Sequence, residues 1–344
     1  MTWLAPLTRH ASRGDLSPLS RGEVGFPALF SVPLTPAQPG RGLGSGANAP
    51  MLTRELLRKI RKIEIVTQRL VRDRMAGQYH SVFKGSGIAF SEVRQYIPGD
   101  DIRLIDWNVS ARMNEPYVKL FVEEREMTVL LLVDMSASGR FGSAEHEKRE
   151  LAAELAAVLA FSAIKNSDRV GLIIFTDEVE RFVPPKKGKK HVLRVISEIL
   201  SFSPESPRTN LAVGLDFLGH IAHHKSVAFL VSDFLSPQSL YERALRIASR
   251  KHDVVPVVVS DPLEQQLPDV GLLDLYDPET GEMVVFDSSG PEARAFAAES
   301  ARQKAAREAL FRRLSLDAIA VSTDRPYLNA LTAFFEARAR RMRH

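Results

Sequence analysis

Residues 127–134 read MTVLLLVD, an apolar run that ends in a carboxylate. The runs RVGLIIFT (169–176), SVAFLVSD (226–233) and VVPVVVS (254–260) have the same character. Short apolar runs rich in Val, Ile and Leu are typical of strands that are buried on both faces of a parallel sheet. We therefore interpret the four runs as core strands of one sheet.

Helical patterns separate these strands along the chain. Helices are expected over residues 147–165, 191–202, 210–222, 240–251, 291–314 and 327–342. Residues 179–183 and 318–322 are expected to add short strands, and residues 274–286 are expected to form a hairpin. Buried strands that alternate with helices predict an α/β fold with a doubly wound, mostly parallel sheet and helices on both of its faces.

The first 125 residues differ from this pattern. Residues 1–50 hold 7 of the 20 prolines and 7 of the 20 glycines without any period, which predicts a disordered extension. Met51 opens a patterned stretch, and we hypothesise that translation starts there rather than at Met1. The predicted organisation is then the extension, a helix with the segment that follows it (51–125), and one α/β domain (126–344).

The helix expected over residues 51–75 is amphipathic and basic. It contains eight Lys or Arg and three Asp or Glu residues, which gives a local charge of +5. Such a helix either binds a membrane surface or a partner, or packs on the protein and leaves its basic face in water. Packing is the commoner case and is the interpretation that we favour.

Composition excludes several kinds of function. Lys and Arg (46) exceed Asp and Glu (42) by only four, which is too little to indicate nucleic acid binding. The chain has no cysteine, and this excludes disulfides and thiolate zinc sites. No apolar run reaches the roughly 18 residues of a membrane-spanning helix, and the N-terminus does not resemble a signal peptide. We therefore expect a cytoplasmic protein without an integral membrane segment.

Polar side chains follow the predicted core strands. Asp134 ends the first strand and is followed by Ser136 and Ser138, while Asp233 ends the third and Thr209 lies in a loop before a helix. Because the carboxyl ends of parallel strands share one edge of the sheet, we expect these five side chains to converge. Their oxygens are suited to a Mg²⁺ or Mn²⁺ ion. The alternative is that they cap helices without any metal.

Enzyme motifs are missing or incomplete. A phosphotransferase that used Asp134 as its nucleophile would need a second carboxylate two residues later, where Ser136 stands. The elbow of a serine hydrolase and the phosphate-binding loop of a nucleotide hydrolase are both absent. The cluster of His220, His223 and His224 lacks a third zinc ligand of known proximity. We expect no enzymatic activity, with a hydrolase at the strand-end pocket as the alternative.

The strand-end residues resemble a known metal site. The spacing Asp134-x-Ser136-x-Ser138, followed in chain order by Thr209 and Asp233, looks like the metal-ion-dependent adhesion site of von Willebrand factor A domains. The resemblance covers about residues 126–344. It implies a domain that binds other proteins through a divalent cation.

A second resemblance lies before the α/β domain. Residues 85–112 read GSGIAFSEVRQYIPGDDIRLIDWNVSAR and are similar to the signature of the bacterial family known as domain of unknown function 58. The matching positions are Glu92, Arg94, Tyr96, Pro98, Gly99, Asp100, Asp101, Arg103, Ile105, Asp106, Trp107, Ser110, Ala111 and Arg112. Members of this family join the segment to a von Willebrand factor A-like domain and resemble partners of MoxR-type AAA+ ATPases. The resemblance implies that the protein acts with such an ATPase in the assembly or activation of an unidentified client.

The signature segment also has a meaning of its own. Its Arg and carboxylate residues surround Tyr96 and Trp107, and such a set either forms a structural network or offers an interaction surface. We favour the structural network. Taken together, the sequence predicts a metal-dependent protein-binding module; a hydrolase and a structural scaffold with an empty metal site are the alternatives.

Overall fold

The computed structural model describes residues 54–70, 79, 82–83, 87–124, 126–142, 147–276 and 282–341. The extension predicted over residues 1–50 lies outside the described residues. The helices are α1 (Arg54–Leu70), α3 (Trp107–Met113), α4 (Lys148–Lys165), α5 (Lys189–Ser201), α6 (Leu211–Ile221), α7 (Gln238–Lys251), α8 (Pro291–Arg313) and α9 (Tyr327–Arg341). The strands are β1 (Gly87–Gln95), β2 (Tyr117–Glu124), β3 (Thr128–Asp134), β4 (Arg169–Phe175), β5 (Val179–Lys186), β6 (Val227–Ser232), β7 (Asp253–Ser260), β8 (Leu272–Tyr276), β9 (Met283–Asp287) and β10 (Ile319–Ser322).

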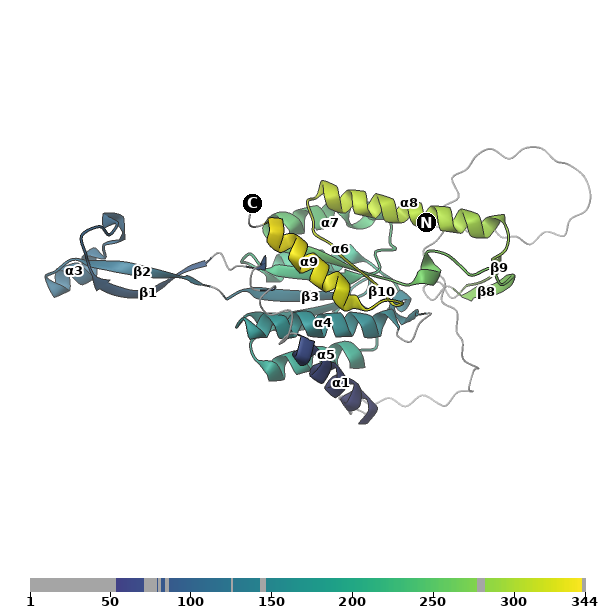
Figure 1. The fold of residues 1–344 in the computed structure, drawn as a ribbon, viewed down its shortest axis with the longest axis horizontal. Coiled ribbons are helices and arrows are strands. Elements are labelled where there is room, and N and C mark those ends of the chain that lie inside the picture. The colour runs from purple at the N-terminus through teal and green to yellow at the C-terminus, as the bar shows by residue number, and fades with distance from the viewer. Residues whose placement is uncertain are drawn as a thin grey trace, which may run out of the picture.

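A six-stranded sheet forms the centre of the molecule. Its strand order is β10-β7-β6-β3-β4-β5, in which the first five strands are parallel and β5 pairs with β4 in the antiparallel direction. Helices cover both faces of this sheet (Figure 1). The doubly wound, mostly parallel α/β fold predicted from the sequence is therefore confirmed.

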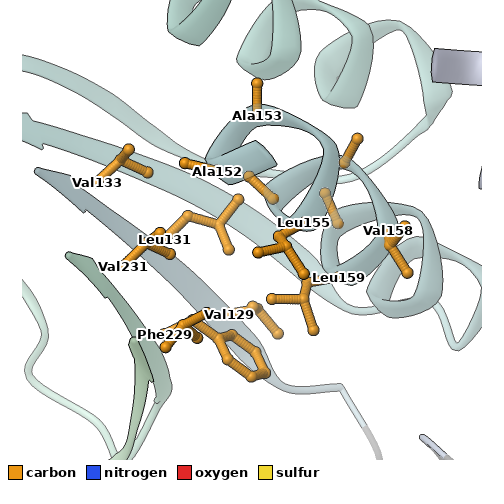
Figure 2. Close-up of a cluster of buried hydrophobic side chains, with 14 of the residues drawn as sticks. Val129, Leu131, Val133, Ala152, Ala153, Leu155, Val158, Leu159, Phe229 and Val231 are labelled. Atoms are coloured by element: carbon orange, nitrogen blue, oxygen red, sulfur yellow. The ribbon is translucent and has the colours of Figure 1, made fainter. Parts of the chain in front are cut away.

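Strand β3 shows how the sheet builds two cores. Val129, Leu131 and Val133 face α4, and Figure 2 shows them packed against Leu155 and Leu159 of that helix. The alternate residues of β3 belong to the opposite core, which α6, α7 and α8 complete. Because successive side chains of a strand point to opposite faces, an unbroken apolar run is what a strand between two helical layers requires.

Helix α4 is apolar around most of its circumference and lies between two layers. The sheet covers one side of it, and α1 and α5 pack on the other side. Ile60 and Ile63 bring α1 into this core, whereas Arg58, Arg61 and Lys62 are exposed. The interpretation of this segment as a packed helix with a solvated basic face is confirmed for residues 54–70, and the rest of the predicted range (51–75) lies outside the described residues.

The signature segment forms an arm, by which we mean residues 87–124. Strands β1 and β2 pair as an antiparallel hairpin, with α3 and a short 3₁₀ helix, η2 (Ile102–Leu104), between them. Figure 1 shows the arm projecting from the rest of the molecule, which we call the body. This hairpin was not predicted from the sequence. Within the described ranges, no helix is both long and apolar enough to cross a membrane.

Part of the charged set in the arm is structural. Arg94 forms a two-point ion pair with Asp100 at 2.6 and 2.8 Å, and Asp106 accepts hydrogen bonds from the first turn of α3. These contacts confirm a structural role for three of the charged residues. Trp107, in contrast, is 71% exposed.

Candidate metal centre

The strand ends bring Asp134 and Asp233 to one edge of the sheet. Asp134 is the last residue of β3, and Asp233 follows Ser232 at the end of the neighbouring parallel strand β6. The Ser232 hydroxyl donates to Asp134 Oδ2 at 2.7 Å and so joins the two strand ends. Phe234 then adopts a left-handed backbone conformation (φ 55°), which turns the chain sharply after Asp233.

The two serines after β3 point toward one another. The Asp134 carboxylate accepts the Ser136 N–H through Oδ1 at 3.0 Å, which fixes the turn. The Ser136 and Ser138 hydroxyl oxygens are 3.1 Å apart, and both residues are buried. Ser136 precedes the short helix η3 (Ala137–Arg140), but its side chain makes no capping hydrogen bond to it. The capping alternative therefore does not account for Ser136.

A small cavity lies between these residues. Its volume is about 20 Å³, close to what one water molecule or one ion needs. Its polar lining consists of Asp134, Ser136, Ser138, Lys148, Arg149, Ser232 and Asp233. Four of the five residues predicted for the metal site thus meet at a single space.

Thr209 occupies the margin of the site. Its loop touches the first site loop, because Ala137 N donates to the Pro207 carbonyl at 3.0 Å. Thr209 itself is half-buried and is not part of the cavity lining. The cap of α6 is Asn210, whose side chain accepts from Ala212 N at 3.1 Å. The structure therefore places Thr209 next to the site without bringing it into the cavity.

Lys148 is the main residue that the sequence analysis missed. It is the first residue of α4, is buried, and lines the same cavity. Its ammonium donates to Asp233 Oδ2 at 2.8 Å and also to the carboxylate of Glu264. The sequence did carry one signal. Lys148 stands in the first turn of a predicted helix, where the helix dipole disfavours a cation, so its position there calls for an explanation.

The electrostatics of the two aspartates differ. Burial, and then the charge of Asp233, raise the pKa of Asp134 from 3.8 to about 6. Burial also opposes the charged form of Asp233, but the nearby Lys148 ammonium outweighs this effect and lowers the pKa of Asp233. Within the described part of the chain, no Lys or Arg forms an ion pair with Asp134. Asp134 is thus the carboxylate that a bound cation would compensate.

These residues fit a hard divalent cation on the Asp134 side of the cavity. One carboxylate and two hydroxyls supply part of the oxygen shell that Mg²⁺ requires, and water completes such shells. The described residues contain no cluster of three or more His, Asp or Glu that would hold a metal, so the serine hydroxyls are needed. Asp233 already pairs with Lys148 through one of its two oxygens, Oδ2, at 2.8 Å.

The same geometry gives no support to a hydrolase. The lining of the cavity, all of it within the described residues, includes no histidine that would activate Ser136 or Ser138. His220 lies on α6, is exposed, and contacts the Asp216 carbonyl at 2.6 Å. A serine nucleophile needs a base within hydrogen-bond reach.

The strand order and the carboxylates at the strand ends define an α/β protein of the von Willebrand factor A-like class. The chain belongs to the family described as protein of unknown function DUF58, whose model matches residues 92–307. An uncharacterized protein of Mycobacterium tuberculosis (strain H37Rv) is 32% identical over 289 residues, which cover 83% of this chain and 90% of that protein. The family predicted from the signature segment is confirmed.

Solved structures resemble the chain more weakly. The conserved hypothetical protein BatB from Bacteroides thetaiotaomicron is 15% identical, with a TM-score of 0.42 over 62% of this chain and 99% of that one. A von Willebrand factor type A structure from Catenulispora acidiphila is 10% identical, with a TM-score of 0.33 over 65% of this chain and 43% of that one. The fold assignment rests on the strand order itself.

Proposed function

We propose that this protein is a protein-binding module that uses a Mg²⁺ or Mn²⁺ ion at the end of β3. The observation that carries the proposal is Asp134, a partly buried carboxylate that no Lys or Arg of the described residues pairs with, beside two buried hydroxyls and a cavity of about 20 Å³. When bound, the cation would offer a coordination position to a carboxylate of another protein. The resemblance of these residues to the metal-ion-dependent adhesion site of von Willebrand factor A domains implies this mode of binding.

Each residue of the site has a distinct task in this proposal. Asp134 supplies the charge that attracts the cation, and Ser232 fixes the second oxygen of that carboxylate. Ser136 and Ser138 orient the cation through their hydroxyls. Thr209 stands beside the cavity, where a water molecule would connect it to the cation.

The proposed partners come from the family resemblance. A MoxR-type AAA+ ATPase is the proposed operating partner, and an unidentified client protein is assembled or activated. The chain carries no phosphate-binding loop of its own, so the nucleotide chemistry belongs to the partner. We place this activity in the cytoplasm.

The test is thermal unfolding of the full chain with and without excess Mg²⁺ or Mn²⁺. A ligand at about 100 times its Kd adds roughly 2.7 kcal/mol to the unfolding free energy. We expect this shift in the wild type and in Asp216→Ala, which removes an exposed carboxylate of α6. We expect no shift in Asp134→Ala. An equal shift in wild type and Asp134→Ala would show that the ion binds elsewhere.

A further inference from the structure

Lys148 already brings a positive charge into the candidate metal centre. Only 3% of its side chain is exposed, and its ammonium lies 2.8 Å from Asp233 Oδ2. The same ammonium pairs with Glu264, whose side chain is 9% exposed. The lysine thus sits between two carboxylates and lines the cavity.

Neighbouring groups fix the lysine in this position. The Lys148 N–H donates to the Phe141 carbonyl at 2.9 Å, and its ammonium lies 5.9 Å from the centre of the Phe141 ring. Glu264 is itself anchored, because it closes a capping box with Asp261 in the short helix η4 (Pro262–Glu264). The ammonium is therefore held at both of its carboxylate partners.

This arrangement decides which carboxylate is open to an added cation. A divalent ion that binds Asp233 must approach an ammonium that already occupies one oxygen of that group, and like charges at such distances repel. In the described part of the chain, the Asp134 carboxylate accepts from the Ser136 N–H and the Ser232 hydroxyl and from no ammonium group. The two aspartates that the sequence presents as equivalent ligands are thus different in the folded protein.

We propose that Lys148 is a built-in cation that holds Asp233 and excludes it from the ligands of a divalent ion. The protein then binds Mg²⁺ or Mn²⁺ through Asp134, Ser136 and Ser138 alone, and weakly. Lys148 acts as a positioning residue that sets the affinity of the site. This inference rests on the proposed metal site and deepens it.

The test measures Mn²⁺ binding by isothermal titration calorimetry to the full-length protein and its variants. Lys148→Met removes the ammonium. The double variant Lys148→Met, Glu264→Gln also removes one carboxylate, so the net charge of the buried cluster stays as in the wild type. We expect both to bind Mn²⁺ at least about tenfold more tightly than the wild type, because Asp233 becomes a ligand. Adding Asp233→Asn to either variant should abolish the gain.

The control is Lys225→Met, which removes the same charge from an exposed position before β6, at the opposite end of the strands. It should bind Mn²⁺ as the wild type does. If Lys148→Met unfolds, the charge-balanced pair alone decides the question, with circular dichroism to verify its fold.

The outcomes separate this inference from the proposed function. Wild-type binding without any gain in the Lys148 variants overturns the role of Lys148 and leaves the metal site standing. No binding in any variant overturns both. If the Lys148 variants bind Mn²⁺ and the wild type does not, the result supports the role of Lys148 as a built-in cation. The same result overturns the metal dependence of the natural protein.

Discussion

Ionisation of the Asp134 carboxyl lowers the stability of the folded protein. Its pKa is raised to about 6, so the folded state binds a proton more tightly than the unfolded chain does. Stability contributed by this proton is present near pH 4 and is lost as the pH rises to about 6. At neutral pH without metal, we expect Asp134→Asn to raise the unfolding free energy by about 1 to 2 kcal/mol.

Urea unfolding in a chelator, at pH 4 and at neutral pH, measures this effect. The gain of Asp134→Asn should be large at neutral pH and small at pH 4, where the wild-type carboxyl is already protonated. Asp216→Asn, at an exposed position, should show no such dependence on pH. A loss of stability in Asp134→Asn at both pH values would mean that its hydrogen bonds outweigh its desolvation.

The residue scale also shows which parts of the site the sequence predicts. Asp134, Ser136, Ser138 and Asp233 were predictable because each stands at or just after a strand end, and parallel strands end at one edge. The contact between Lys148 and Asp233 was not, because the two residues lie 85 positions apart and only the folded sheet brings them together. The pattern of residue types along the chain does not show which distant residues come into contact.

At the scale of elements, the packing of α6 on β4 depends on a glycine. A side chain added at Gly214 would place its Cβ 2.8 Å from Phe175 Cδ1, so the ring would have to move. At Gly219 of the same helix, a Cβ would meet nothing within 4 Å. The two positions therefore form a matched pair.

We expect Gly214→Ala to lower the unfolding free energy by about 1 to 2 kcal/mol, since overpacking exceeds the gain in helix propensity. Gly219→Ala should be neutral or raise it by up to about 1 kcal/mol. Urea midpoints of both variants, measured side by side, give the comparison. Equal stabilisation by the two alanines would show that α6 shifts freely on the sheet.

The elements of the body were predictable from the sequence, and the arm was not. Core strands such as β3 are continuous apolar runs between helices, which is a strong pattern. In β1 and β2 the register shifts between Phe90 and Glu92, and the hairpin packs against no helical layer of the body in Figure 1. Val118 of β2 is buried, but a two-stranded hairpin outside the helical layers gives a weaker hydrophobic pattern than a central strand does.

At the scale of the whole molecule, the arm carries an apolar tip away from the body. Its exposed large side chains are Ile97, Ile102, Leu104, Trp107 and Met113. Exposed apolar groups on one projection are typical of a surface that binds another protein, and Trp is among the residue types enriched at the centre of such contacts. The arm tip is therefore our candidate contact for the proposed MoxR-type ATPase.

We expect Trp107→Ala to weaken binding of that ATPase at least tenfold without changing the unfolding midpoint, because Trp107 is 71% exposed and supports no core. The matched control is Leu240→Ala on α7, which removes an apolar side chain that is 61% exposed on the body. Binding of the immobilised ATPase to the three proteins gives the comparison. If Trp107→Ala binds as tightly as the wild type and Leu240→Ala does not, the ATPase contacts the body. Loss in Trp107→Ala alone, in Mg²⁺ and in chelator alike, would assign the ATPase to the arm and leave the strand-end site for the client.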